Sequence, residues 1–155
     1  MERSVDKNKC WKVGSIAIAT IFLYFGGMVY LLFRPERLLV FDWLGAVNLL
    51  SVVESLRLSN HCMPQWMEYS LPDGLWVFSY YLFVGSIWDF KIKKCWMALI
   101  VLPFIAIMDE ILQYYGVAVG TFDMIDIVAY TLATLTGFCY LVIVDKSIKN
   151  DIIYE

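Results

Sequence analysis

Residues 13–33 read VGSIAIATIFLYFGGMVYLLF, a run of 21 residues without a charged side chain. An α-helix of that length rises roughly 31 Å, which is enough to cross the hydrocarbon core of a bilayer. A cleaved signal peptide has a shorter apolar region and ends at small residues, whereas this run leads straight into Arg34. The run therefore predicts a first transmembrane helix, and Gly26 and Gly27 would let a neighbouring helix approach closely.

The same pattern of apolar blocks continues through the rest of the 155-residue chain. The chain is 61% hydrophobic and 17% charged, whereas soluble domains are about 45–50% apolar and about 25% charged. Further blocks at 71–88, 95–115 and 123–144 predict three more transmembrane helices, the first of them opened by Pro72 at its first turn. We expect an all-α polytopic protein whose single transmembrane domain covers residues 1–155.

The segment from Leu38 to Leu58 is apolar but interrupted by polar and charged residues. Asn48, Ser51 and Ser55 would share one face of a helix, which predicts an amphipathic helix over 38–58 lying in the membrane interface. The alternative is a fifth transmembrane helix over 41–56.

Basic residues decide between four and five transmembrane helices. With four, the N-terminal segment, the 89–94 loop and the C-terminal tail share one side, and they hold nine of the twelve lysines and arginines. A fifth helix would move the three lysines of the loop to the other side. The positive-inside rule therefore favours four helices, with the N-terminus and the C-terminus in the cytoplasm.

Several function classes find no support in the sequence. The net charge is only −3, so no nucleic-acid partner is expected. Cys10, Cys62, Cys95 and Cys139 show no C-x-x-C spacing, and the single histidine, His61, excludes a histidine-rich zinc site. No Walker loop or nucleophile elbow is present. We expect no cofactor and no metal, with a divalent cation on oxygen ligands as the one metal alternative.

Acidic residues gather where the third and fourth predicted membrane helices face each other across the short 116–121 turn. A charged residue at mid-bilayer costs about 2.5–3.5 kcal/mol, so such residues should face the bundle interior. Asp109 and Gln113 are four residues apart on one helix face. The fourth helix carries one stripe made of Asp123, Asp126, Tyr130, Thr134 and Gly137. With Glu110, four carboxylates should converge on an outward-facing polar cleft, unless they only cap or end their helices.

Carboxylates this close should raise each other's pKa, hold a cation or pair with an arginine. Arg34 and Arg37 follow the first membrane helix on the same predicted side, so at least one should reach the acidic hairpin instead of snorkelling to lipid phosphate. The predicted ligand-binding cleft therefore consists of Arg34, Arg37, Asp73, Asp109, Glu110, Gln113, Asp123, Asp126 and Tyr130. No residue among them is assigned a catalytic role.

The motif Asp109-Glu110-x-x-Gln113, followed by Gly120-Thr121-Phe122-Asp123-x-x-Asp126 and then Gly137, resembles the VanZ-like family of small membrane proteins. The segment from Asp73 to Tyr81 is similar to the family's Asp-Lys-x-x-His-Phe-x-x-Tyr segment, so the resemblance covers about residues 71–144. It implies a multi-pass protein of the bacterial cytoplasmic (inner) membrane with a cell-envelope role, of the kind associated with resistance to glycopeptides or lipopeptides.

The chain also departs from that family at three positions. Gly74, Val77 and Thr121 stand where the family often has lysine, histidine and arginine. An activity that needs those side chains is therefore not expected here, unless Arg34 or Arg37 supplies the missing positive charge.

Three functions are compatible with these features. The first is an envelope protein that binds a lipid or glycolipid headgroup or another amphiphile, with arginines on phosphate and carboxylates on ammonium or hydroxyl groups. The second is an immunity protein or accessory subunit with a protein partner or a homo-oligomeric assembly. The third is a membrane enzyme that uses carboxylates as general acid and base on an envelope lipid. Because no nucleophile with an adjacent base is evident, the balance leans away from an enzyme.

Overall fold

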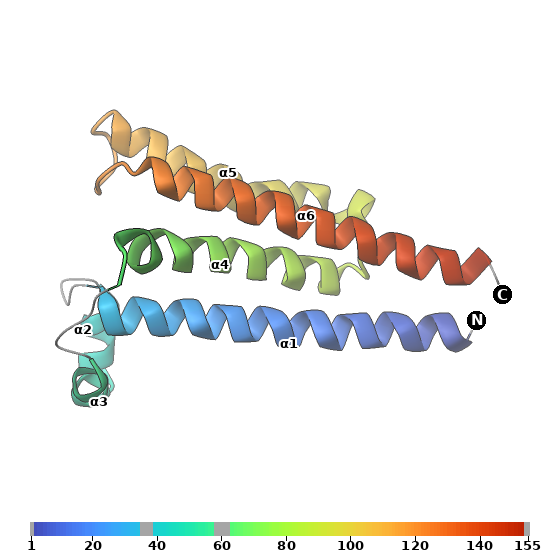
Figure 1. Cartoon of the computed structure of the whole chain (residues 1–155), viewed down its shortest axis with the longest axis horizontal. Helices are drawn as coiled ribbons and strands as arrows, with labels where there is room; N and C mark the ends of the chain where they lie inside the picture. The colour runs from blue at the N-terminus through green and yellow to red at the C-terminus, as the bar shows by residue number, and fades with distance from the viewer. Residues whose placement is uncertain (1, 35–38, 58–62, 154–155) are drawn as a thin grey trace.

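A computed structural model describes residues 2–34, 39–57 and 63–153, with side chains for 7–34, 40–57 and 63–150. Within these ranges the chain is helical and has no strand. Four long helices form the body of the molecule (Figure 1): α1 Glu2–Phe33, α4 Gln65–Ile87, α5 Ile92–Tyr114 and α6 Met124–Ile153. Two short helices, α2 Leu39–Ala46 and α3 Leu50–Leu56, lie at the end of α1 that is remote from both termini.

Three of the long helices are long and apolar enough to cross a membrane, namely Lys7–Phe33, Ile92–Tyr114 and Met124–Asn150. They agree with a multi-pass membrane protein and coincide with the predicted first, third and fourth membrane helices. Helix α4 has 23 residues like α5, but it does not have the apolar composition of the other three.

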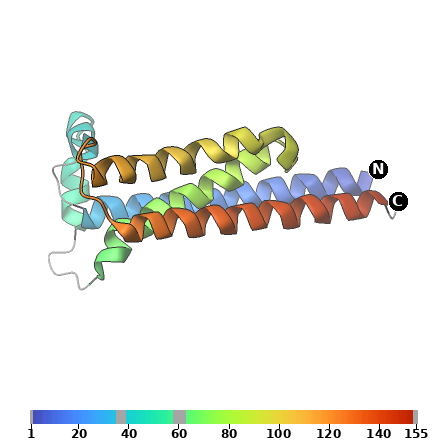
Figure 2. The same cartoon turned by 90° about the horizontal axis from the view of Figure 1, so that it is seen from above.

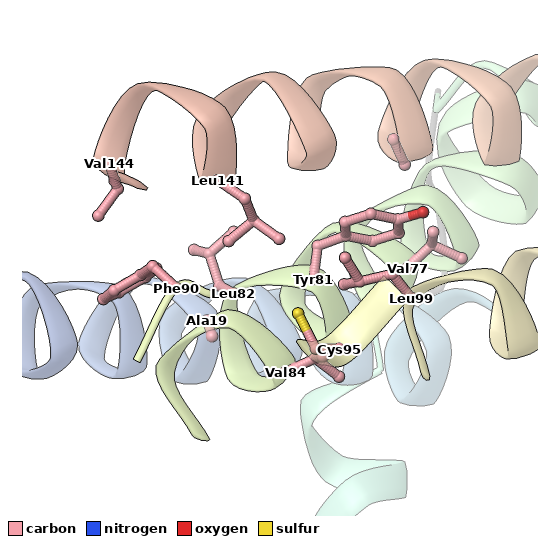
Figure 3. Packing of buried hydrophobic residues seen from close by; sticks show 11 residues of the cluster. Ala19, Val77, Tyr81, Leu82, Val84, Phe90, Cys95, Leu99, Leu141 and Val144 are labelled. Carbon is pink, nitrogen blue, oxygen red and sulfur yellow. The ribbon is translucent and has the colours of Figure 1, made fainter. Parts of the chain in front are cut away.

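Helix α4 is the central element of the bundle. It packs against α1, α5 and α6, and Figures 1 and 2 show it between α1 and α6, with α5 to one side. The buried cluster of Figure 3 joins all four helices through Ala19, Val77, Tyr81, Leu82, Val84, Cys95, Leu99, Leu141 and Val144. A less apolar helix can therefore lie among apolar ones, because its neighbours shield it on several sides.

Glycines allow the close approach of α4 to its neighbours. A Cβ atom on Gly26 would lie 2.7 Å from Nε1 of Trp76, and a Cβ atom on Gly137 would lie 2.7 Å from Cβ of Tyr81. Small residues at helix contacts are the usual device for packing within membranes. Gly27, in contrast, has nothing within 4 Å of its added Cβ position, so only Gly26 has the predicted packing role.

The start of α4 differs from the prediction. The helix begins at Gln65 instead of residue 71, and Pro72 lies inside it instead of at its first turn. Proline removes a backbone hydrogen bond, but neighbouring groups in membrane helices can satisfy the freed carbonyls. The Pro72 ring is buried, and Arg34 donates to the carbonyl of Tyr69 in the turn just before it.

The predicted single amphipathic helix over 38–58 is wrong. The structure has two short helices of eight and seven residues, which are separated around Asn48. Asn48 has a φ of +57°, a left-handed conformation that asparagine tolerates better than most residues. Ser51 and Ser55 therefore do not share one continuous helix with Asn48, and neither short helix is long enough to be a fifth membrane helix. Leu38 and Leu58 lie outside the described residues.

At the end of the bundle that carries both termini, the turn between α4 and α5 is tied to α1. The Asp89 carboxylate pairs with Lys12 at 2.5 Å and accepts a hydrogen bond from Nδ2 of Asn8 at 3.3 Å. The hydrogen bond from Lys12 is the main cause that lowers the pKa of the Asp89 carboxyl. Lys91 lies 3.8 Å from the same carboxylate.

The described cysteines Cys10, Cys95 and Cys139 are free, and Cys62 and His61 lie outside the described residues.

Candidate functional site

A polar pocket of about 540 Å³ lies at the opposite end of the bundle, where the end of α1, the start of α4, the end of α5 and the start of α6 meet. It is lined by Tyr30, Arg34, Gln65, Tyr69, Asp73, Trp76, Asp109, Glu110, Gln113, Gly120, Thr121, Asp123, Asp126 and Tyr130. Its volume falls within the range of small-molecule sites, roughly 300–1,000 Å³.

The structure brings together eight of the nine residues predicted for the cleft. The eight that line the pocket are Arg34, Asp73, Asp109, Glu110, Gln113, Asp123, Asp126 and Tyr130. Arg37 lies outside the described residues. The expected convergence of the hairpin carboxylates is therefore present, whereas the binding of a ligand by these residues stays a prediction.

Arg34 is the cation of the pocket. Its Nη2 atom lies 3.5 Å from Oδ2 of Asp73 and donates to the carbonyl of Tyr69 at 2.7 Å. Its guanidinium carbon also lies 5.1 Å from the ring centroid of Tyr30 and 4.6 Å from that of Tyr69. An arginine thus reaches the acidic pocket as predicted, but its ion-pair partner is Asp73 on α4 and not a carboxylate of the α5–α6 hairpin.

Arg57, at the end of α3, holds the end of α1 in place. Its Nη2 donates to the carbonyl of Arg34 at 2.8 Å, and its Nη1 donates to the carbonyl of Leu31 at 3.1 Å. These carbonyls belong to the last turn of α1, where backbone acceptors have no partner within the helix. The short helices therefore help to position Arg34 at the pocket.

Two of the hairpin carboxylates have a structural hydrogen bond. Oδ1 of Asp123 accepts the backbone N–H of Ile125 at 2.8 Å, which caps the N-terminus of α6. Oε2 of Glu110 accepts the backbone N–H of Asp123 at 3.1 Å, and the Glu110 side chain is 5% exposed. The capping alternative is therefore correct for Asp123, although that residue also lines the pocket.

The other two hairpin carboxylates are Asp109 and Asp126. Oδ2 of Asp109 accepts a hydrogen bond from Nε2 of Gln113 at 2.8 Å, so the predicted i, i+4 pair forms. Gly120 has a φ of +145°, and an added Cβ there would lie 2.6 Å from Oε1 of Gln113, so the loop needs glycine to pass over this side chain. Oδ1 of Asp126 is buried without a hydrogen-bond partner among the described residues.

Two features of the pocket favour a polar ligand. The described residues of its lining include five carboxylates and one guanidinium, so their formal charge is −4. Besides Oδ1 of Asp126, Nε of Arg34 is buried without a hydrogen-bond partner in the described part of the chain. Buried polar atoms normally find partners, so two orphans around one pocket indicate a place for a further polar group.

Three residues of α4 that line the pocket, Gln65, Tyr69 and Trp76, were not predicted for the cleft. Together with the predicted Asp73 they fall at spacings of 0, 4, 8 and 11 on one helix face. Gln65 and Tyr69 precede residue 71, where the predicted helix began, so that helix contained only half of the stripe. The structure places Trp76 between Gly26 and the pocket.

Among the described residues, no group of three or more histidine, cysteine, aspartate and glutamate side chains is arranged to hold a metal ion. The lining offers a ligand hydrogen bonds, charged groups for ion pairing and aromatic rings.

No family model, curated protein or solved structure matches the chain. The interpretation of the pocket thus depends on its own geometry.

Proposed function

We propose that α4 is a fourth transmembrane helix and that both termini lie in the cytoplasm, so that the polar pocket opens at the outer face of the membrane. Helices α1, α5 and α6 surround α4 and cover its polar residues. The lysines of the N-terminal segment, the 91–94 segment and the C-terminal helix lie at the end opposite the pocket, which fits the positive-inside rule. The two short helices would then lie at the outer interface.

We further propose that the protein is a VanZ-like component of the bacterial cell envelope that binds the amine-bearing headgroup of a lipid, glycolipid or other amphiphile. The observation that carries this proposal is the excess of five carboxylates over one guanidinium among the described lining residues, combined with the orphaned Oδ1 of Asp126 and Nε of Arg34. Sequestering such an amphiphile is consistent with the resistance-type role that the family resemblance implies.

An ammonium group fits the pocket for two physical reasons. With Asp73 already paired to Arg34, four carboxylates remain to attract a cation. Trp76 and Tyr130 also line the pocket, and an aromatic ring face can stabilise a cation; the rings of Tyr30 and Tyr69 already contact Arg34. The orphaned Nε of Arg34 is a donor that a phosphate oxygen of the same headgroup could accept.

Two short-chain lipids that differ only in their headgroups test this proposal. Dihexanoyl phosphatidylethanolamine and dihexanoyl phosphatidylglycerol are added to the protein in a neutral detergent, and the thermal unfolding midpoint is measured. Ligands that bind only the folded state raise that midpoint, and at equal concentration the tighter ligand raises it more. We expect the amine-bearing lipid to raise it more than the anionic lipid.

The difference between the two lipids should disappear in Asp109→Asn/Asp126→Asn and persist in Asp42→Asn. Asp42 is an exposed carboxylate on α2 that does not line the pocket, so its substitution controls for the loss of a negative charge. Equal responses to both lipids in the wild-type protein, or a stronger response to the anionic one, would contradict the proposal.

A further inference from the structure

A second pocket of about 500 Å³ lies on the opposite face of α4 from the polar pocket. It is an apolar groove between α1 and α6, and no residue of α5 lines it. Its floor consists of small residues of α4 and α6, among them Ser70, Gly74 and Ala129. Phe22 of α1 and Leu132 of α6 contribute to its walls. The two pockets share no lining residue, so what fills the groove is independent of what the polar pocket binds.

We propose that this groove holds one acyl chain of a membrane glycerolipid, with the hydroxyl of Ser70 donating a hydrogen bond to the ester carbonyl of that chain. The lipid belongs to the leaflet on the side of the polar pocket.

The length of the groove matches one leaflet. On α6 it runs from Ile125 to Thr136, which is about 16 Å along the helix axis. The hydrocarbon core of a bilayer is about 30 Å thick, so one leaflet contributes about 15 Å. The end of the groove at Trp66 and Ser70 is level with Tyr69, which contacts the interfacial Arg34. The groove therefore extends from the depth of the lipid esters to mid-bilayer.

Ser70 supplies the polar observation that points to a ligand. Its residue is 2% exposed, and its Oγ has no hydrogen-bond partner among the described residues. Two other buried serines of α4 behave differently, because Oγ of Ser79 donates to the carbonyl of Leu75 at 2.8 Å and Oγ of Ser86 donates to that of Leu82 at 2.7 Å. Ser70 is thus the one of these three whose hydroxyl is left for an acceptor outside the helix.

Photo-crosslinking in vesicles tests the proposal directly. The full-length protein is reconstituted in phosphatidylcholine doped with a phosphatidylcholine that carries a diazirine in one acyl chain. After illumination, labelled peptides are quantified by mass spectrometry. We expect labelling per exposed residue to be higher in segments 66–78 and 125–136 than on the lipid-facing surface of α5.

Paired variants make the test specific. Leu132→Trp fills the groove and should remove most of its labelling, whereas Ile105→Trp on α5 should not, although both residues are 57% exposed. Ser70→Ala removes only a hydroxyl. In a host of ether-linked phosphatidylcholine, which has no ester carbonyl to compete with the probe, this change should weaken labelling about fivefold, the usual effect of losing one neutral hydrogen bond, whereas Ser86→Ala should leave labelling unchanged. Uniform labelling of all lipid-facing helices, or labelling that is indifferent to both Leu132→Trp and Ser70→Ala, would overturn the proposal. Protein–protein crosslinks across the groove in place of lipid adducts would also overturn it, because they would identify a second copy as the occupant.

Discussion

Replacing Arg34 by methionine should destabilise the folded protein strongly and should expose how the polar pocket is held together. The substitution keeps an apolar stem of similar length but removes the guanidinium. That group joins α1 to α4 through Asp73 and Tyr69 and stacks on Tyr30. Its loss also leaves the Asp73 carboxylate without its ion-pair partner.

The size of the effect follows from these contacts. A hydrogen bond from a charged donor contributes about 1.5–3 kcal/mol, and a cation–π contact about 0.5–1 kcal/mol. The side chains of Arg34 and Asp73 are 18% and 19% exposed, so solvent screens them less than a surface pair. We therefore expect Arg34→Met to lower the free energy of unfolding by about 2–4 kcal/mol, allowing for incomplete additivity. In a double-mutant cycle with Asp73→Asn, the coupling energy should be about 1–2 kcal/mol.

The free energy of unfolding can be measured by titrating the protein in neutral micelles with sodium dodecyl sulfate and following circular dichroism. Lys93→Met is the matched control, because Lys93 is exposed at the other end of the bundle, and its loss should change stability by no more than about 0.5 kcal/mol. A similarly small effect of Arg34→Met, or zero coupling to Asp73→Asn, would refute the proposed role of this ion pair.

Two further predictions concern the packing of the bundle and its opposite end. Gly137→Ala should destabilise the protein by about 1–3 kcal/mol in the same titration, because the new methyl group would collide with Cβ of Tyr81. Gly14→Ala is the control and should be neutral or stabilising, since nothing lies within 4 Å of a Cβ added there. Equal effects of the two changes would argue against the close contact of α4 and α6. The lowered pKa of the Asp89 carboxyl means that its pairing stabilises the fold above the carboxyl's ordinary pKa of 3.8 and that this contribution is lost as the pH falls through the lowered value. Lys12→Gln should therefore cost up to about 1 kcal/mol at neutral pH, and the difference from wild type should shrink in acid; a difference that grows in acid would contradict this assignment.

The three apolar helices could be predicted from the sequence because each contains a long run without charges. Their ends were less predictable, since α6 continues to Ile153, beyond the predicted end at residue 144. Nothing in a hydropathy pattern stops a helix at the membrane surface. The start of α4 and the break at Asn48 were missed because each depends on tertiary contacts or on one backbone angle.

The hairpin half of the pocket was predictable, because the spacing of Asp109 and Gln113 and of Asp126 and Tyr130 fixes a helix face. The pairing of Arg34 with Asp73 was not predictable, because spacing within one helix does not reveal which helix packs beside it. The role of Trp76 was not predictable either, because its position against Gly26 depends on the contact of α1 with α4.

The measurement that tests the central claim most directly is native mass spectrometry of the protein purified from membranes in a gentle detergent. Wild type and Asp42→Asn should retain an amphiphile of defined mass that carries an amine, and Asp109→Asn/Asp126→Asn should lose it. The same bound species in all three proteins, or none in any of them, would contradict the claim that the polar pocket binds an amine-bearing headgroup.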